Sequence, residues 1–539
     1  MIREISRRKC LRLWLCKPEY MERTKWENRF VLLRFRKKNY MMFLKDLKRY
    51  QMERLYDKLK AYSESDFYAF HMPGHKRNKA LLGIELPYDL DITEIDGFDD
   101  LHHADGILKE EQERAARVFG AEESHFLVNG STAGILSAVM GCTHRGDKIL
   151  VARHCHKSIY HAIYMNGLVP RYVYPEFDIS MHMNGEISKE DVAKALAAEP
   201  DIKAVVIVSP NYDGVVSDVK GIAEVVHSYG IPLIVDEAHG AHFGFDPYFP
   251  ESANMYGADL VINSLHKTLP ALTQTALLHV NGDMVKRRKV KQYLDMLQTS
   301  SPSYILMASI DACIGMLEET LETHSDARSD YKYKNIFSEY ANRIEALRKD
   351  LKRLKYLKII QTDNTDRYDR SKFVISVKHA PMSSHELYKI LLHRYHLQME
   401  MLAGTYVLAM TTVGDTQEGL DRLRDALLEI DKEIDTRQGR SAAIETDLPL
   451  SGRQPALEKV WTIAEAVNRR DKIQKRSFED SIGCISVEYA YLYPPGSPLI
   501  VPGERITKEA VEILHWYQDH DFSIEGLQSE DGIEVWIDG

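Results

Sequence analysis

The stretch "KAVVIVSPNYDGVVSDVKGIAEVVHSYGIPLIVDEAH" (203–239) contains two apolar runs separated by a helical segment. The runs, at 203–210 and 231–239, are apolar along most of their length, whereas a half-buried strand would alternate apolar and polar residues. The segment between them, 220–229, reads as a helix. This order predicts an α/β fold, in which a largely parallel sheet is covered by helices on both faces.

The same alternation continues on both sides of this stretch, from about residue 120 to residue 282. A further helix is expected at 189–198, and further apolar runs occur at 125–130, 148–153, 171–175, 258–264 and 276–280. Sheets of this kind bind ligands at the carboxyl ends of their strands. Polar residues that directly follow an apolar run are therefore candidate site residues.

After residue 300 the pattern changes to that of a smaller α+β unit. Long helices are expected at 301–322 and 340–354, followed by a strand, two more helices and a polar stretch rich in turn residues. We predict five parts, namely a basic N-terminal extension (1–51), a large domain (52–325), a small α+β domain (326–436), a linker (437–460) and a C-terminal domain (461–539).

Composition narrows the class of protein. The chain has 539 residues, of which 44% are hydrophobic and 28% are charged, as in an ordinary globular protein, and no apolar stretch has the length of a membrane span. Its six cysteines form no C-x-x-C pair, which argues against a disulfide framework or a metal site. We therefore predict a cytoplasmic protein with no metal and no membrane partner.

The first 50 residues differ in charge from the rest. They contain 16 Lys and Arg against 5 Asp and Glu, which leaves −21 for the remainder of a chain whose net charge is −10. The segment could be a transit peptide or a basic tail that binds nucleic acid. We favour a third interpretation, in which translation begins at Met41, Met42 or Met52 and the segment is dispensable.

Two polar clusters follow apolar runs in the first half of the sheet. In "VNGSTAGILSAVMG" (128–141), Ser131 and Thr132 stand where a strand runs into a helix. A helix start binds phosphate well, although Ser and Thr also serve there as ordinary caps. In "HCHKSIYHA" (154–162), His156 stands at a similar junction, where it could stack on a flat ligand or simply cap the helix.

Asp236 follows the apolar run Leu233–Val235, so we expect a carboxylate at the edge of the sheet. An apolar strand followed by Asp-Glu-Ala-His is also found in helicases. Such proteins need G-x-x-x-x-G-K-[ST] to hold the nucleotide, and neither Gly-Lys-Ser nor Gly-Lys-Thr occurs in this chain. The acidic remainder of the chain argues against nucleic acid as well.

The stretch "NSLHKTLPALTQTALLH" (263–279) places Lys267 just after another apolar run. A lysine near a core is a poor structural residue and a good amine nucleophile, because burial disfavours its charged form. Lysine can form an imine with an aldehyde cofactor, a carboxylate can pair with a pyridinium nitrogen, and a helix start can hold a phosphate. In combination these residues predict pyridoxal 5'-phosphate, PLP.

The chain resembles the Orn/Lys/Arg decarboxylase family of fold-type-I PLP enzymes. The resemblance covers roughly residues 55 to 510 and rests on "FHMPGHK" (70–76), "DITEIDGFDDLH" (91–102), "FLVNGSTAGI" (126–135), "HCHKS" (154–158), "VDEAHGAHFGF" (235–245), "SLHKTLPALTQTALLH" (264–279), "TSSPSY" (299–304) and "YPPGSPLIVPGE" (493–504). It implies a PLP-dependent transferase-like large domain of the aspartate aminotransferase type, with a small α+β domain and a C-terminal domain.

The resemblance also implies a role for each matching residue. Lys267 would be the Schiff-base lysine, Asp236 would pair with the pyridinium nitrogen, and His156 would stack on the ring. His239 would lie beside the ring. The cofactor phosphate would be held by Ser131, Thr132, Ser264 and His266. Ser300 would reach the cofactor phosphate in a partner subunit. We therefore expect a homodimer or a larger homo-oligomer with shared active sites.

The reaction implied by the resemblance is decarboxylation of a basic amino acid to a polyamine-pathway amine and CO₂. Arginine is favoured, with lysine and ornithine as alternatives. An aminotransferase or another PLP lyase on the same fold stays open. So does a catalytically silent regulator, although such a protein would usually lack Lys267 or Asp236, and both are present.

Overall fold

The computed structural model describes residues 53–80, 83–178, 183–323, 333–360, 366–436, 454–493 and 496–537. The chain divides into two units, Met1–Glu53 and Arg54–Gly539, and the helices and strands of the fold belong to the second. The predictions for 1–51 lie outside the described residues, as does the greater part of the predicted linker, 437–453. The domain boundaries given above stay predictions.

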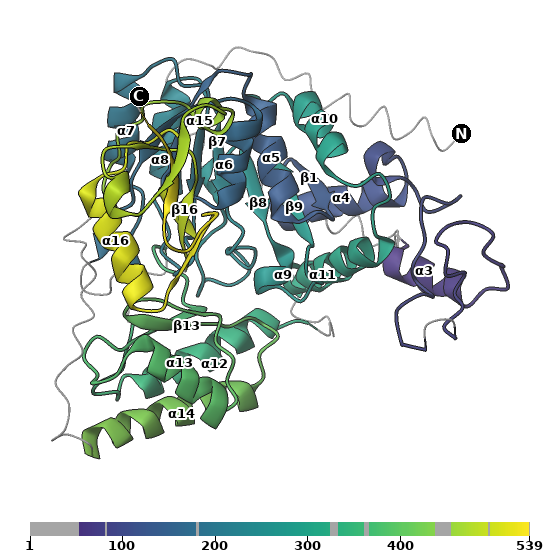
Figure 1. Ribbon diagram of the computed structural model, residues 1–539. Helices are drawn as coiled ribbons and strands as arrows, with labels where there is room; N and C mark the ends of the chain where they lie inside the picture. Colours follow the sequence, from purple (N-terminus) through teal and green to yellow (C-terminus); the bar gives the residue numbers. More distant parts are fainter. Residues whose placement is uncertain are drawn as a thin grey trace, which may run out of the picture. The chain divides into compact units, whose positions relative to one another are not determined.

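A seven-stranded sheet forms the centre of the large domain (Figure 1). Its strand order is β1-β9-β8-β7-β6-β2-β3, and β9 alone runs antiparallel to its neighbours, so the prediction of a mostly parallel sheet is confirmed. The strands are β1 (Glu123–Leu127), β2 (Lys148–Ala152), β3 (Val169–Val173), β6 (Val205–Val208), β7 (Leu233–Asp236), β8 (Leu260–Asn263) and β9 (Ala276–Val280).

Several strands end before the apolar runs do. The runs at 203–210 and 231–239 form strands only over Val205–Val208 and Leu233–Asp236. The first residue beyond each strand still bonds to the neighbouring strand, Ser209 N–H to the backbone oxygen of Asp236 and Glu237 N–H to that of Ile262, and the residues after it form loops. These loops line the carboxyl edge of the sheet, which is where ligands bind in folds of this kind.

Two hydrophobic cores lie on opposite faces of the sheet, because successive side chains of a strand point to opposite sides. In β1, Phe126 belongs to one core and Leu127 to the other, and Leu277 and Leu278 divide in the same way in β9. The core of Leu127 includes α5 (Gly130–Cys142), α6 (Lys157–Met165) and α8 (Val219–Ser228). The core of Phe126 includes α4 (Ile107–Val118) and α11 (Tyr304–Thr323), and it continues into the small domain.

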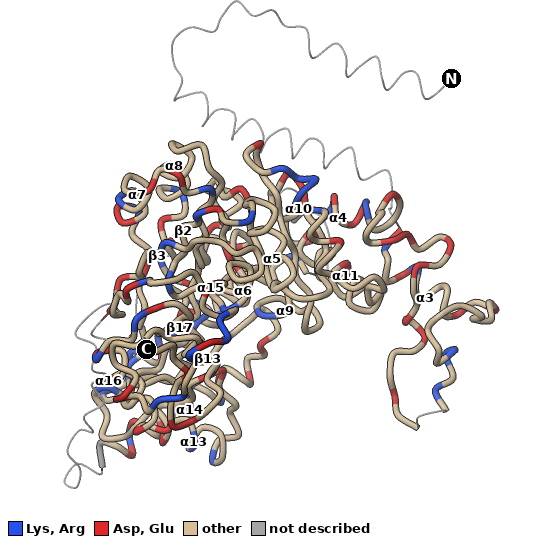
Figure 2. Tube along the Cα trace, turned by 45° about the horizontal axis from the view of Figure 1, so that its top comes forward, with Lys and Arg blue, Asp and Glu red and all other residues tan. Residues whose placement is uncertain are grey.

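A basic run opens α10 (Arg287–Leu297) and is visible as a blue segment in Figure 2. Arg287 donates to Glu122 at 2.7 Å and to Glu123 at 2.9 Å. These bonds fix the start of α10 beside β1, and α10 packs along α5. Arg287 therefore has a structural role in holding this helix beside the sheet.

In its described part, the small domain has an antiparallel sheet of order β10-β11-β13-β12 and three helices. Its strands are β10 (Lys358–Ile359), β11 (Lys372–Ser376), β12 (Met401–Leu402) and β13 (Tyr406–Met410), and its helices are α12 (Ile336–Leu351), α13 (Ser384–Arg394) and α14 (Gln417–Thr436). Its content agrees with the predicted α+β unit.

The C-terminal domain contains two three-stranded sheets, of order β14-β19-β15 and β17-β16-β18, and α16 (Lys508–Asp519). The sheets consist of β14 (Ile473–Arg476), β15 (Ile485–Ser486), β16 (Ala490–Tyr493), β17 (Ser497–Ile500), β18 (Ser523–Glu525) and β19 (Ile533–Trp536).

A buried ion pair joins the C-terminal domain to the large domain. Two guanidinium nitrogens of Arg153, the residue after β2, donate to the two carboxylate oxygens of Glu504, each at 2.8 Å. Arg153 also donates to the backbone oxygen of Leu499 at 2.9 Å. The two charged side chains are only 1% exposed, so each depends on the other for its charge to be balanced.

Candidate active site

The predicted site residues come from neighbouring elements at one edge of the sheet. Asp236 is the last residue of β7, and Ser264 directly follows β8. Lys267 lies in the short helix α9 (Leu265–Thr268), and His156 caps α6 just beyond β2. Because β2, β7 and β8 are mutually parallel, their carboxyl ends share this edge.

Lys267 and His239 form a direct contact at the centre of this edge. Nζ of Lys267 lies 2.9 Å from Nε2 of His239. Burial lowers the pKa of the Lys267 amine, while the charge of Asp236 opposes the shift. Burial also holds the pKa of His239 well below its usual range, and the positive charge of Lys267 adds to the effect. The imidazole is therefore neutral at pH 7, and it can accept a hydrogen bond from the amine.

The carboxylate of Asp236 is buried. It is 3% exposed and accepts a hydrogen bond from the backbone N–H of Ala238 at 3.1 Å. Burial raises its pKa, and the charge of Lys267 counteracts this effect. A buried carboxylate of this kind is stabilised by a cationic partner, which a protonated ring nitrogen would provide.

Two serine hydroxyls meet at the start of α5. Oγ of Ser131, in the first turn of the helix, lies 2.5 Å from Oγ of Ser264. Just before them, Gly130 adopts a φ of 71° and donates its N–H to the backbone oxygen of Gln274 at 3.0 Å. Hydroxyl donors beside a helix N-terminus are suited to a phosphate. Thr132, in the same turn, is exposed, so its hydroxyl is accessible.

His156 and His266, the two other histidines among the predicted site residues, form hydrogen bonds with nearby residues. Nδ1 of His156 accepts from the backbone N–H of Ser158 at 3.2 Å, which fixes the ring at the exposed start of α6. The surrounding protein and the charge of Lys267 lower the pKa of His156 to about 4, so the ring is neutral at pH 7. Nδ1 of His266 lies 2.8 Å from the backbone oxygen of Thr275 and donates to it, which leaves Nε2 for a ligand.

Ser300 is set apart from this group. It is exposed in the segment between α10 and α11. The neighbouring Thr299 donates its backbone N–H to Oδ1 of Asn129 at 3.3 Å, so the segment lies against the start of α5. Within the described ranges, no bond joins Ser300 to another predicted site residue. Its role in a partner subunit's site stays a prediction.

Sequence reasoning missed two side chains that the fold brings to Lys267. The ring centroid of Tyr212 lies 4.6 Å from that of His239, and the Tyr212 hydroxyl donates to Oε1 of Glu400. Tyr212 follows β6, so the strand-end signal that identified Asp236 could have found it. Glu400 comes from the small domain, and its local sequence contains no comparable signal.

A second missed group is a buried ion pair with a histidine. Nζ of Lys372 lies 3.2 Å from Oδ2 of Asp369, and Nε2 of His242 lies 3.1 Å from Oδ1 of the same carboxylate. All three side chains are at most 2% exposed. The charge of Lys372 reaches the site, since it helps to lower the pKa of Lys267 and that of His239.

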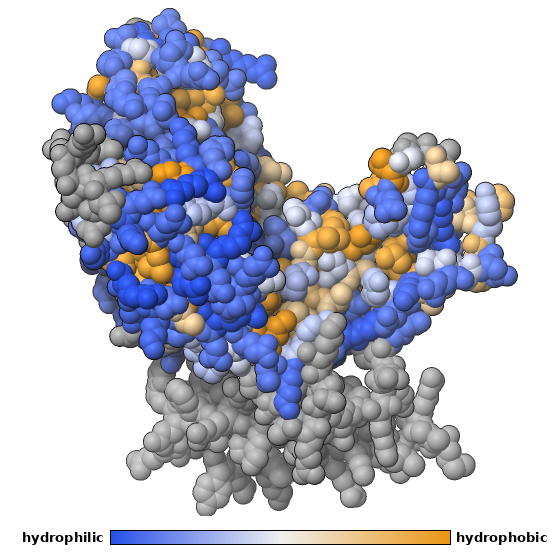
Figure 3. Space-filling model, turned by 90° about the horizontal axis from the view of Figure 1, so that it is seen from below, coloured by the Kyte–Doolittle hydropathy of each residue, from blue (hydrophilic) through white to orange (hydrophobic). Residues whose placement is uncertain are grey.

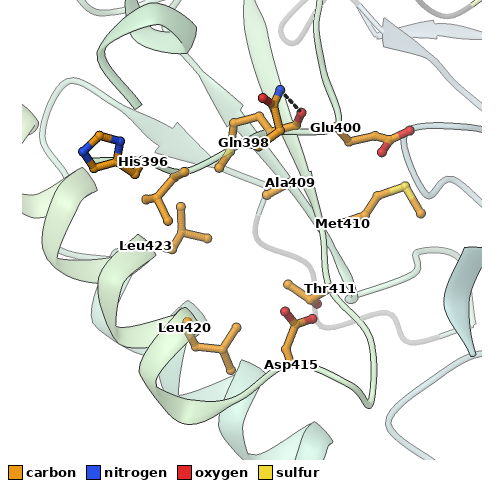
Figure 4. Close-up of a pocket in the computed structure, with 12 residues that line it drawn as sticks. His396, Gln398, Glu400, Ala409, Met410, Thr411, Asp415, Leu420 and Leu423 are labelled. Atoms are coloured by element: carbon orange, nitrogen blue, oxygen red, sulfur yellow. Dashed lines mark hydrogen bonds between the residues drawn. The ribbon is translucent and has the colours of Figure 1, made fainter. Parts of the chain in front are cut away.

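A cavity of about 330 Å³ lies in the small domain (Figure 4). Leu420 and Leu423 of α14 line one side, and Gln398 and Ala409 line another. None of the predicted site residues lines it. Glu400 contributes to its wall, but in Figure 4 the carboxylate points away from His396.

Comparison with known proteins agrees with the resemblance seen in the sequence. The family model described as "Orn/Lys/Arg decarboxylase, major domain" matches residues 53–388, and the model of the C-terminal domain of that family matches residues 453–534. The uncharacterized protein YaaO of Bacillus subtilis is 36% identical over 468 residues, covering 85% of this chain and 93% of YaaO.

An arginine decarboxylase of Bacillus subtilis is 32% identical over 482 residues, covering 88% of this chain and 95% of that protein. The crystal structure of the lysine decarboxylase LdcF of Francisella novicida superposes with a TM-score of 0.76 at 18% identity, covering 89% of this chain and 80% of LdcF. The superposition shows a common fold, and the family models together with these relatives show that the chain belongs to the Orn/Lys/Arg decarboxylase family.

Proposed function

We propose that this chain is a PLP-dependent decarboxylase that converts a basic amino acid, arginine foremost, into the corresponding amine and CO₂. The observation that carries the proposal is the contact between Lys267 and His239 beside the buried Asp236. The relatives support arginine, because the Bacillus subtilis arginine decarboxylase matches over 88% of this chain. The lysine decarboxylase LdcA of Pseudomonas aeruginosa matches over 40% of it, at 30% identity.

The side chains present fit this cofactor. Lys267 offers an amine of lowered pKa, and Asp236 offers a buried carboxylate for the ring nitrogen. Nδ1 of His239 is buried and has no hydrogen-bond partner among the described residues, so a polar group of a ligand could complete its bonding. Ser131 and Ser264 offer adjacent hydroxyls at a helix start, which suit a phosphate.

When bound, PLP supplies an electron sink for the bond that breaks at Cα of the substrate. Lys267 would hold the cofactor through its amine, and Asp236 would keep a proton on the pyridine nitrogen through its negative charge. His156 would cover one face of the ring. Cα of the product needs a proton, and Nζ of Lys267 is the donor in place to deliver it, while Nε2 of His239 accepts a hydrogen bond from that amine and orients it.

The decisive experiment separates decarboxylation from amino-group transfer. The purified protein is supplied with PLP and with arginine labelled at its carboxyl carbon, without any keto acid. Lysine and ornithine are run in parallel. We expect sustained release of labelled CO₂ over many turnovers. If none of the three releases CO₂ and an added keto acid starts amino-group transfer, the chain is an aminotransferase instead.

We also propose a homodimer or larger homo-oligomer. Four large apolar side chains in the segment around "FHMPGHK" are strongly exposed, namely Phe67 (69%), Tyr68 (70%), Phe70 (89%) and Met72 (66%). Figure 3 shows apolar side chains at the surface on the side where Figure 1 places α3 (Leu55–Ser63). Clustered apolar residues of this kind often mark a protein–protein contact. Sedimentation of active protein as a monomer would contradict this part of the proposal.

A cytoplasmic location is the last part of the proposal. The four cysteines in the described part of the chain, Cys142, Cys155, Cys313 and Cys484, are free thiols, which is usual in a reducing compartment. None of the helices in the described ranges combines the length and the apolar character needed to cross a bilayer.

A further inference from the structure

Glu400 connects the small domain to the candidate active site. It directly precedes β12, and its backbone N–H donates to the backbone oxygen of Leu408 at 3.0 Å, which fixes the residue at the edge of β13. Its carboxylate accepts a hydrogen bond from the hydroxyl of Tyr212, in the loop after β6. This bond therefore crosses from the small domain to the carboxyl edge of the large sheet.

The contacts continue from Tyr212 to the reactive amine. The Tyr212 ring lies 4.6 Å from the ring of His239, and His239 lies 2.9 Å from Nζ of Lys267. The negative charge of Glu400 also reaches Lys267, since it opposes the effect of burial on the pKa of that amine. The side chains of Tyr212 and His239 thus connect Glu400 to Lys267. The negative charge of Glu400 raises the pKa of the Lys267 amine.

Two neighbouring carboxylates differ from Glu400 in accessibility. Asp236 is 3% exposed and lies within the sheet. Asp213 is 2% exposed and accepts from the hydroxyl of Tyr406 at 2.5 Å. Glu400 is exposed, and among the described residues no bond is made to its Oε2. Of these three carboxylates, Glu400 alone is exposed, so it alone can be reached by a solute.

We propose that Glu400, oriented by Tyr212, binds the cationic end of the substrate side chain. This inference rests on the proposed function, because it concerns a basic amino acid whose α-amino group lies at Lys267. The cationic group of such a substrate is several bonds away from Cα, so it needs a carboxylate outside the buried Asp236. A guanidinium group can bond a carboxylate through two parallel N–H donors, and an ammonium group can bond it as a point charge.

The test compares two amines that differ in the charge at their far end. Agmatine has a guanidinium group there, n-pentylamine has a methyl group, and neither has a carboxylate to lose. Their affinities for the PLP-loaded enzyme are measured by calorimetry, for wild type and for Glu400→Gln. We expect Glu400→Gln to weaken agmatine binding by about tenfold or more and to change pentylamine binding less than about twofold. Glu418→Gln, at an exposed glutamate in the first turn of α14, should change neither.

Equal effects of Glu400→Gln on the two amines, or no effect on either, would overturn the inference. Tyr212→Phe provides a second measurement, since it keeps the ring beside His239 and removes the hydroxyl. It should weaken agmatine binding in the same direction by a smaller factor. A larger effect than that of Glu400→Gln would show that the hydroxyl binds the cation and would also overturn the inference. Failure of the proposed function is seen separately, as absence of CO₂ release by the wild-type enzyme.

Discussion

Nζ of Lys267 lies 2.9 Å from Nε2 of His239, and burial lowers the pKa of both side chains. The lysine therefore loses its proton more readily than an exposed lysine, and the histidine stays neutral. A neutral amine is the nucleophilic form, so this contact gives Lys267 the property that attack on an aldehyde requires. The same contact gives a proton a short path between the two nitrogens.

Replacing Lys267 with alanine should abolish both the visible absorbance of lysine-linked PLP and turnover. Turnover should fall by at least about 10³-fold, because the residue is expected both to hold the cofactor and to take part in proton transfer. Absorbance spectra and labelled CO₂ release measure the two effects. Lys389→Ala, at an exposed position in α13, is the control. A Lys267→Ala protein that keeps its colour and its rate would remove Lys267 from the proposed role.

Replacing Asp236 with asparagine tests the carboxylate without changing its shape. The variant should still bind PLP, because Lys267 and the serines remain. It should decarboxylate about 10²- to 10⁴-fold more slowly, because a neutral amide does not stabilise a protonated ring nitrogen as an anion does. Single-turnover measurements isolate the chemical step. Wild-type rates in Asp236→Asn would refute the pairing with the ring.

Ser131→Ala and Ser264→Ala should each weaken the binding of PLP by about tenfold, since each removes one donor to a charged phosphate. Titration of the apoprotein with PLP gives the dissociation constants. The two effects should not add in the double variant, because the hydroxyls touch each other at 2.5 Å. Ser137→Ala is a matched control, since Ser137 lies in the same helix, is buried and has no hydrogen-bond partner for Oγ among the described residues. Unchanged affinity in the double variant would place the phosphate elsewhere.

His279 should make stability depend on pH. It is fully buried, its Nδ1 lies 2.6 Å from Oγ of Ser124, and burial lowers its pKa to about 3. In the unfolded chain its pKa would be about 6.5, so between these values the unfolded state binds more protons. The free energy of unfolding should therefore fall by up to about 1.4 kcal/mol per pH unit as the pH drops through this window.

His279→Gln removes this titration, so its free energy of unfolding should depend less steeply on pH between about 6.5 and 4 than that of wild type. Denaturant unfolding at several pH values provides the measurement. Identical slopes for wild type and His279→Gln would show that the buried ring does not control the effect.

The sequence predicted candidate site residues that follow parallel strands, and the structure explains why these candidates lie together. Asp236, Ser264 and Lys267 each come within a few residues of a strand end, so the strand pattern alone brings them to one edge. Glu400 could not be found in this way, because its position depends on how a separate domain packs. Ser300 could not be assigned within one chain either, since its predicted role requires a second subunit.

The ends of the strands in the same region could not be predicted from the apolar pattern of the sequence. An apolar run indicates burial, but it does not show where the backbone leaves the sheet. The run at 231–239 stays in the sheet only as far as Asp236, and the residues after it turn back, so that His239 faces Lys267. The position of His239 therefore depends on the turn that follows Asp236, whereas the strands form because their apolar side chains are buried.

The bond between Arg153 and Glu504 has a consequence for anyone who wishes to shorten this protein. A fragment that ends with the small domain would lose both Glu504 and Leu499, the two residues of the C-terminal domain that bond the guanidinium of Arg153. Arg153 and the apolar side chains that the C-terminal domain covers would then be exposed to water. Arg153 stands three positions before His156, so the newly exposed surface would begin beside the proposed cofactor site. We therefore expect a minimal catalytic fragment to need its C-terminal sheets, even though they supply none of the groups expected to touch the reacting atoms.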